Sequence, residues 1–169
     1  MALTLDGTNG ISTPALLNNG SNGSGNLGTS TGYFNTAFVK AASAQYADLA
    51  ENYTADAKYA PGTVVSFGGA SEVTVTPTDA DRAVAGVIST NPSYLMNSGL
   101  ESKFVAAVAL TGRVPTRVRG TVKKGDMMVS AGYGAARAEA NPAVGSVIGK
   151  ALEDHTGDEG IIEVVVGRF

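Results

Sequence analysis

The sequence predicts an all-β protein, with a compact β-barrel or β-sandwich domain preceded by an extended Gly/Asn/Ser-rich N-terminal arm. Beyond Gly62, short runs of β-branched residues alternate with Gly, Pro, Asn or Asp, and no stretch has the length of a long helix. Residues 18–26 consist only of Asn, Gly and Ser, which bury too little apolar surface to offset their ordering entropy. We therefore predict an arm (1–35), a connecting segment (36–60) and a β domain (61–169).

The composition excludes several classes of protein. The chain has 169 residues and no cysteine, so disulfides, thiolate metal sites and cysteine nucleophiles are excluded. A net charge of −3 argues against a nucleic-acid partner, and no apolar run approaches the roughly 20 residues that cross a membrane. Charged residues make up only 16% of the chain, against about 25% in an average protein. We expect neighbouring subunits to cover much of the surface, in a homo-oligomer.

The arm contributes most of the predicted partner contacts. Its candidate contact residues are all apolar or aromatic: Leu3, Leu5, Ile11, Leu16, Leu17, Tyr33 and Phe34. Residues 28–39 predict a turn followed by one short strand with aromatic anchors. An arm with so few charges is suited to adding its backbone to a neighbouring sheet.

The connecting segment differs from the arm in composition. Between Lys40 and Ala50, alanines replace glycines, and Tyr46, Leu49 and Tyr53 fall at helical spacing. This pattern predicts either a short helix or an irregular strap. The Pro61-Gly62 pair that follows is a strong turn signal.

Eight short strands are predicted in the β domain. Their ranges are 63–67, 72–76, 83–89, 104–110, 114–119, 127–130, 145–151 and 160–166. Residues 61–68 also resemble residues 124–132, and each stretch is followed by a strand that contains Val-Ile, at 84–88 and 144–148. Two such units predict a pseudo-symmetric barrel. Chance similarity between glycine-rich strands is the alternative.

Motifs for catalysis, metals and cofactors are scarce. The single histidine, His155, excludes zinc sites that need two imidazoles and leaves a serine triad only through this residue. It stands in the polar stretch 152–160, which predicts a hairpin turn and lacks the ligand spacing of an EF-hand. Neither a phosphate-binding loop nor a dinucleotide fingerprint occurs. We expect no enzyme, no cofactor and no metal site.

Two further sets of residues are candidate partner contacts. Arg113, Arg117 and Arg119 share parity along one predicted strand, so their side chains project from one face. This face is either solvated, or docks on an acidic neighbour, or binds an anionic glycan. Tyr94 lies in the predicted loop 91–97, where it either contacts a partner or caps the core.

The chain resembles a family of phage proteins. Four stretches, 43–53, 86–92, 109–115 and 122–126, look like the C-terminal domain of tailed-bacteriophage fibre and appendage proteins. The upstream stretch 28–35 is similar to the short repeat that leads into that domain, so the resemblance covers most of residues 28–169. It implies a homotrimeric virion protein with intertwined N-terminal β segments and a β-rich distal domain.

Part of this resemblance concerns self-cleavage. Residues 47–51, Ala-Asp-Leu-Ala-Glu, are similar to a motif in the self-cleaving domain of phage neck appendages, where an upstream serine and two acids act in intramolecular cleavage. The matching residues are Ser43, Asp48 and Glu51. Leu49 replaces the family's tyrosine, and Asn52-Tyr53 replaces its aromatic pair. We therefore expect Asp48 and Glu51 to cap or solvate the connecting segment.

Taken together, the sequence predicts a small trimeric decoration or cement-type protein of a bacteriophage virion, anchored by its arm and displaying a β domain. Its expected partners are the major capsid protein or another virion protein, with assembly in the host cytoplasm and a final place on the capsid or tail surface. One alternative is the terminal domain of a tail or neck fibre that binds a host-surface glycan. The other is an autoproteolytic intramolecular chaperone.

Overall fold

The structure, a computed structural model, describes residues 15, 17, 20–21 and 25–167. Its contacts divide the chain into two units, residues 1–42 and 43–169. All ten strands belong to the second unit, and the described residues contain no helix, so the all-β prediction is confirmed. Accordingly, no helix in the described part of the chain is long and apolar enough to cross a membrane.

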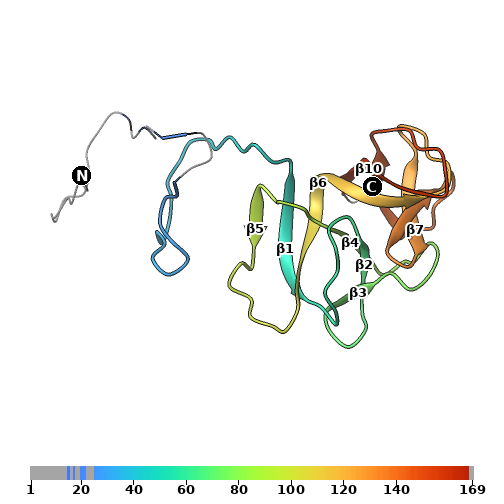
Figure 1. Ribbon diagram of the computed structural model, residues 1–169, viewed down its shortest axis with the longest axis horizontal. Helices are drawn as coiled ribbons and strands as arrows, with labels where there is room; N and C mark the ends of the chain where they lie inside the picture. The colour runs from blue at the N-terminus through green and yellow to red at the C-terminus, as the bar shows by residue number, and fades with distance from the viewer. Residues whose placement is uncertain (1–14, 16, 18–19, 22–24, 168–169) are drawn as a thin grey trace. The chain divides into compact units, whose positions relative to one another are not determined.

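The ten strands are short except for one. Their bounds are β1 Asp48–Thr54, β2 Val64–Phe67, β3 Val73–Val75, β4 Val84–Ile88, β5 Tyr94–Met96, β6 Val105–Arg119, β7 Met127–Gly132, β8 Ala135–Ala138, β9 Val147–Ala151 and β10 Glu159–Val166. Strand β6 has 15 residues, and Figure 1 shows it running from the group of β1 to β5 toward the group that holds β7 and β10.

Strand β6 belongs to two closed circuits of strands. Its N-terminal half joins the circuit β1–β6–β4–β2–β3, which closes through a parallel bridge between Ala55 and Val73. Its C-terminal half joins the circuit β6–β10–β9–β7–β8, which closes through a parallel pair between Val118 and Ala136. Each circuit is a small five-stranded barrel, so neither has a long unpaired edge.

The two barrels are repeats of one another. Val65 pairs with Val75 and Gly86. A shift of 63 positions turns these three residues into Met128, Ala138 and Gly149, and Met128 pairs with Ala138 and Gly149. The irregularity after Val65 recurs after Met128, and the two closing bridges obey the same shift. We name residues 48–110 repeat 1 and residues 111–166 repeat 2.

The last strand of each repeat follows a smaller shift. Ile88 pairs with Val108 in repeat 1, and Ala151 pairs with Val164 in repeat 2. Ala151 lies 63 positions after Ile88, but Val164 lies only 56 positions after Val108. The connection that carries β5 in repeat 1 is thus seven residues longer than the connection between β9 and β10. This finding supports the interpretation of two units, although 84–88 corresponds to 147–151 and not to 144–148.

Both repeats bury the same set of positions. Repeat 1 packs a cluster of six buried residues: Ala55, Val65, Val73, Ile88, Ala106 and Val108. The corresponding residues of repeat 2 are all buried in the larger core: Val118, Met128, Ala136, Ala151, Ile162 and Val164. Along β10 and the second half of β6, these side chains alternate with more exposed ones, as expected where one face of a strand lines a barrel interior.

One glycine in each repeat allows two strands to approach closely. A Cβ atom on Gly86 would collide with the carbonyl oxygen of Ala109, and one on Gly149 would collide with the carbonyl oxygen of Val165. These two collisions occur at corresponding positions, so each repeat needs a residue without a side chain there.

Some local predictions were wrong. Residues 104–110 and 114–119 form the single strand β6, and β1, β5 and β8 were not predicted. The helix expected within 40–50 is absent: residues 40–47 are irregular, as in the strap alternative, and β1 starts at Asp48 and pairs along its whole length with β6. The strand expected within 28–39 is also absent, and only a bridge between Thr29 and Gly32 forms there.

We expect the substitution Gly149→Ala to destabilise the protein by about 2 kcal/mol, because the new methyl group must displace backbone of β10. In a chain of this size, this loss lowers the Tm by roughly 6 °C in a thermal melt. Gly99→Ala is the matched control, since open space surrounds Gly99, and it should shift stability by less than about 0.5 kcal/mol. Equal effects of the two substitutions would contradict the repeat geometry.

Candidate functional site

Strand β1 separates the three self-cleavage candidates. Ser43 is exposed, five positions before the strand. Asp48 and Ala50 are buried on one face of β1, and Glu51 shares the opposite parity with Tyr53. The carboxylates of Asp48 and Glu51 therefore leave the strand on opposite sides, and the structure does not bring the three groups into one site.

Asp48 is fixed by its backbone. Its carbonyl oxygen accepts hydrogen bonds from the amide of Ser93 at 2.9 Å and from the hydroxyl of Ser93 at 2.8 Å. Its side chain is only 6% exposed, and Oδ2 has no hydrogen-bond partner within the described residues. The close approach of residues 47 and 48 also leaves no room for a side chain at Gly112. This arrangement anchors β5 to β1 at the start of the β unit.

Glu51 is held by an aromatic pair. The hydroxyl of Tyr53 donates to Oε2 of Glu51 at 2.8 Å, and the ring of Tyr53 meets the ring of Phe67 edge to face, with centroids 5.6 Å apart. Such ring pairs are favourable beyond their buried area. The Tyr53 hydroxyl and its ring contact therefore hold the Glu51 carboxylate in place.

We expect the wild-type protein to run as a single band of 17.0 kDa on a denaturing gel, because Ser43 lacks both carboxylates as partners. The Ser43→Ala variant should run identically. Two fragments from the wild type, with one intact band from Ser43→Ala, would establish the autoproteolytic alternative instead.

A groove of about 730 Å³ lies between the two repeats. Repeat 1 contributes Glu51, Tyr53, Phe67, Leu110 and residues 82–86, and repeat 2 contributes residues 145, 147, 148 and 166, followed by Gly167. The described residues of the groove include one carboxylate, Glu51, and one guanidinium, Arg82, whose Nε donates to the carbonyl oxygen of Val144 at 2.9 Å. Sequence reasoning did not predict this groove. The two-residue spacing of Glu51 and Tyr53, which places both on one face of a strand, is the signal in the sequence that could have indicated part of it.

The three arginines of β6 have different surroundings. Val114, Thr116 and Val118 are at most 1% exposed, so the arginines lie on the other face of the strand. Arg119 forms an ion pair with Glu159 at 2.8 Å and lies over the ring of Tyr133. Arg113 is exposed and Arg117 is half-buried. Their predicted contact with an acidic neighbour or an anionic glycan stays a prediction.

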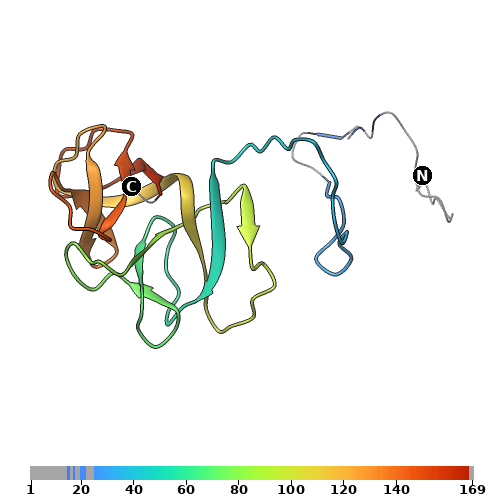
Figure 2. The ribbon, with the colours of Figure 1, turned by 180° about the vertical axis from the view of Figure 1, so that it is seen from behind.

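Tyr94 lies in β5, not in a loop. Strand β5 pairs in parallel with β1, and the side chains of Asn52 and Asn97 each bond the other's carbonyl oxygen at 3.2 and 3.1 Å. Tyr94 is 62% exposed, so it does not cap the core. Figure 2 shows β5 beside β1, and no other described strand pairs with β5. The outer edge of β5 is open to a partner.

Several apolar residues of the arm and of the connecting segment just after it are exposed, and their predicted partner contacts stay a prediction. Leu17 is 84% exposed, Tyr33 80%, Phe34 71% and Phe38 97%. The other arm candidates, Leu3, Leu5, Ile11 and Leu16, lie outside the described residues.

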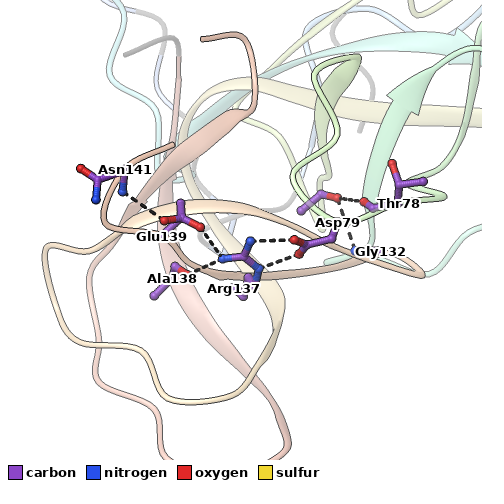
Figure 3. Close-up of polar contacts among 8 residues, drawn as sticks. Thr78, Asp79, Gly132, Arg137, Ala138, Glu139 and Asn141 are labelled. Carbon is purple, nitrogen blue, oxygen red and sulfur yellow. Dashed lines mark hydrogen bonds and ion pairs between the residues drawn. The ribbon is translucent and has the colours of Figure 1, made fainter. Parts of the chain in front are cut away.

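The densest ionic network in the described chain joins the two repeats. The guanidinium of Arg137 donates to both oxygens of Asp79, at 2.6 and 2.7 Å, and to Glu139 at 2.9 Å. Figure 3 shows Arg137 between these two carboxylates. Nearby, the hydroxyl of Ser130 donates to the carbonyl oxygen of Thr78. Asp79 belongs to the connection between β3 and β4, so the network ties this connection to repeat 2 and is structural.

The same network shifts the pKa values of its carboxyl groups. The hydrogen bond from Arg137 lowers the pKa of Asp79, and the amide of Asn141, assisted by Arg137, lowers the pKa of Glu139. The two carboxylates together raise the pKa of Arg137. All three groups therefore stay charged at neutral pH.

We expect Asp79→Asn to cost at most about 1 kcal/mol at pH 7, since this ion pair is largely solvent-exposed. The pKa of Asp79 is lower in the folded chain, so its contribution is present above the usual value of 3.8 and is lost as the pH falls through the folded value. Urea melts of wild type and variant should differ at pH 7 and converge in acid. Asp158→Asn, an exposed control, should show no such convergence.

His155 has a structural place. Its Nδ1 donates to the carbonyl oxygen of Gly120 at 2.9 Å, and its backbone pairs with Val122. It stands in the connection between β9 and β10, where a polar turn was expected. Within the described part of the chain, no three His, Cys, Asp or Glu side chains are grouped to hold a metal ion.

No protein-family model matches the chain, and no curated protein matches its sequence. The fold and its site thus define an all-β protein of two repeated five-stranded barrels with an inter-repeat groove and an open β5 edge.

Proposed function

We propose that the protein is a structural component of a bacteriophage virion, a homotrimeric decoration or cement-type protein that attaches through its N-terminal arm and displays the β unit. The exposed arm is the observation that carries this proposal. Four large apolar side chains within seven residues, Tyr33, Phe34, Phe38 and Val39, are 68–97% exposed. Exposed apolar surface of this density marks a contact site.

The open edge of β5 offers a complementary surface on the β unit. Ser93 turns its amide toward β1, so the two-residue period of a strand turns the amides of Tyr94 and Met96 outward. An extended segment that adds to this edge gains main-chain hydrogen bonds as well as contact with Tyr94. The aromatic and β-branched residues of segment 33–39 suit such a strand.

The resemblance to fibre and appendage proteins supports the virion setting and the trimer. The low share of charged residues, 16%, fits a chain whose surface is partly covered by neighbours. Burial of the arm against a shell of capsid subunits stabilises both partners by mass action.

Deleting residues 1–42 should abolish attachment to the particle and leave a folded β unit, because it removes the exposed side chains of segment 33–39 and all ten strands begin after residue 42. Virion occupancy is measured by quantitative gel of purified particles, and folding by circular dichroism. The full-length variant Val144→Ser, which removes an 85% exposed apolar side chain from the β unit, should attach like wild type. Unchanged occupancy by the truncated protein would contradict the proposal.

A second candidate function is host-surface binding by the terminal domain of a tail or neck fibre. The inter-repeat groove favours it, since mixed apolar and polar concave sites of 300–1,000 Å³ commonly bind small ligands. Labelled protein should then adsorb to host cells, and excess unlabelled protein should compete. Absence of saturable adsorption would remove this candidate and leave the structural role intact.

A further inference from the structure

At the groove, corresponding residues of the two repeats differ in their exposure. Glu51, Tyr53 and Phe67 correspond in register to Val114, Thr116 and Ser130 of repeat 2. The repeat 2 residues are at most 1% exposed, whereas Phe67 is 47% exposed and the other two are half-buried. The same end of the barrel is therefore closed in repeat 2 and open in repeat 1.

The closed end has an identifiable cap. The connection between β3 and β4 of repeat 1 crosses Ser130, with a bridge between Asp79 and Ala131 and a hydrogen bond from the amide of Ala80 to the carbonyl oxygen of Ser130 at 2.8 Å. Arg137 holds this connection through Asp79. No described segment crosses Phe67 in the corresponding way, so the barrel mouth of repeat 1 remains open.

The open mouth also carries larger and more polar side chains than the closed one. Where repeat 2 has a valine, a threonine and a serine, repeat 1 has a carboxylate, a phenol and an aromatic ring. Substitution of small buried residues by these groups at a barrel mouth fits ligand recognition, since such mouths are frequent binding sites.

The chemistry of the lining indicates the class of ligand. Among the described residues that line the groove, only Glu51 and Arg82 are charged, and their charges are opposite. A carboxylate accepts hydrogen bonds and a guanidinium donates them, so together they match hydroxyl groups, which do both. The half-exposed ring of Phe67 offers an apolar face for C–H groups.

We propose that this groove is a saccharide-binding site that takes a neutral, hydroxyl-rich glycan, with Phe67 as the stacking platform and Glu51 and Arg82 as hydroxyl ligands. The volume of about 730 Å³ accommodates a short oligosaccharide. The hydrogen bond from Tyr53 fixes the Glu51 carboxylate in advance, which lowers the ordering cost of binding. The inference rests on the second candidate function, because it names the class of host-surface ligand.

The test uses the full chain on an array of bacterial surface oligosaccharides, followed by calorimetric titration with the best-bound glycan. The double substitution Glu51→Val and Phe67→Ser gives repeat 1 the residues of repeat 2 and should reduce affinity at least about tenfold. Glu51→Gln, which preserves shape, should also weaken binding. Tyr133→Ala is the matched control, since it removes a 74% exposed aromatic ring outside the groove, and should bind like wild type.

Near-ultraviolet circular dichroism and size-exclusion chromatography accompany each variant. Binding that the groove substitutions remove and Tyr133→Ala retains supports the site. Wild type that binds no glycan on the array, or binding that the groove substitutions leave unchanged, overturns it. A change in oligomer size without glycan binding shows that another copy's arm fills the groove, and also overturns it. Adsorption to cells without glycan binding overturns only this inference and leaves host-surface binding standing.

Discussion

The rest of the β unit depends on the sharing of one strand between two barrels. Strand β6 pairs with β1 and β4 through its first half and with β10 and β8 through its second. Because side chains alternate along a strand, the register of β6 decides at once which residues enter each interior. The buried series from Ala106 to Val118 on this strand therefore supports both cores.

Sharing a strand also makes the two repeats unequal. Repeat 1 gives its β3–β4 connection to close the end of repeat 2, and the Arg137 ion pairs keep that connection in place. Repeat 1 receives no such closure from the described residues. Repeat 1 thus has both the open barrel end and the extra strand β5.

The sequence predicted most of the strands and the fold class because their alternation of β-branched residues is local. It did not predict β1, since the alanines of 41–50 and the spacing of Tyr46, Leu49 and Tyr53 favour a helix, and only the pairing with β6 makes residues 48–54 extended. Strand β5 has three residues and little periodicity. The repeat was visible as a weak echo at Gly62 and Gly125, but the correct shift of 63 needed the pairing registers. The groove combines residues from both repeats, so no local motif could reveal it.

The continuity of β6 has a consequence for how the β unit comes apart. A chain of independent domains has linkers at which one part melts or is cut while the other persists. Here the backbone that passes from one barrel to the other is itself a strand, paired with β1 as far as Gly112 and with β10 from Gly112 onward, and loss of either interior removes pairing from the same 15-residue strand. The two barrels are expected to melt as a single cooperative transition and to resist proteolysis at their junction.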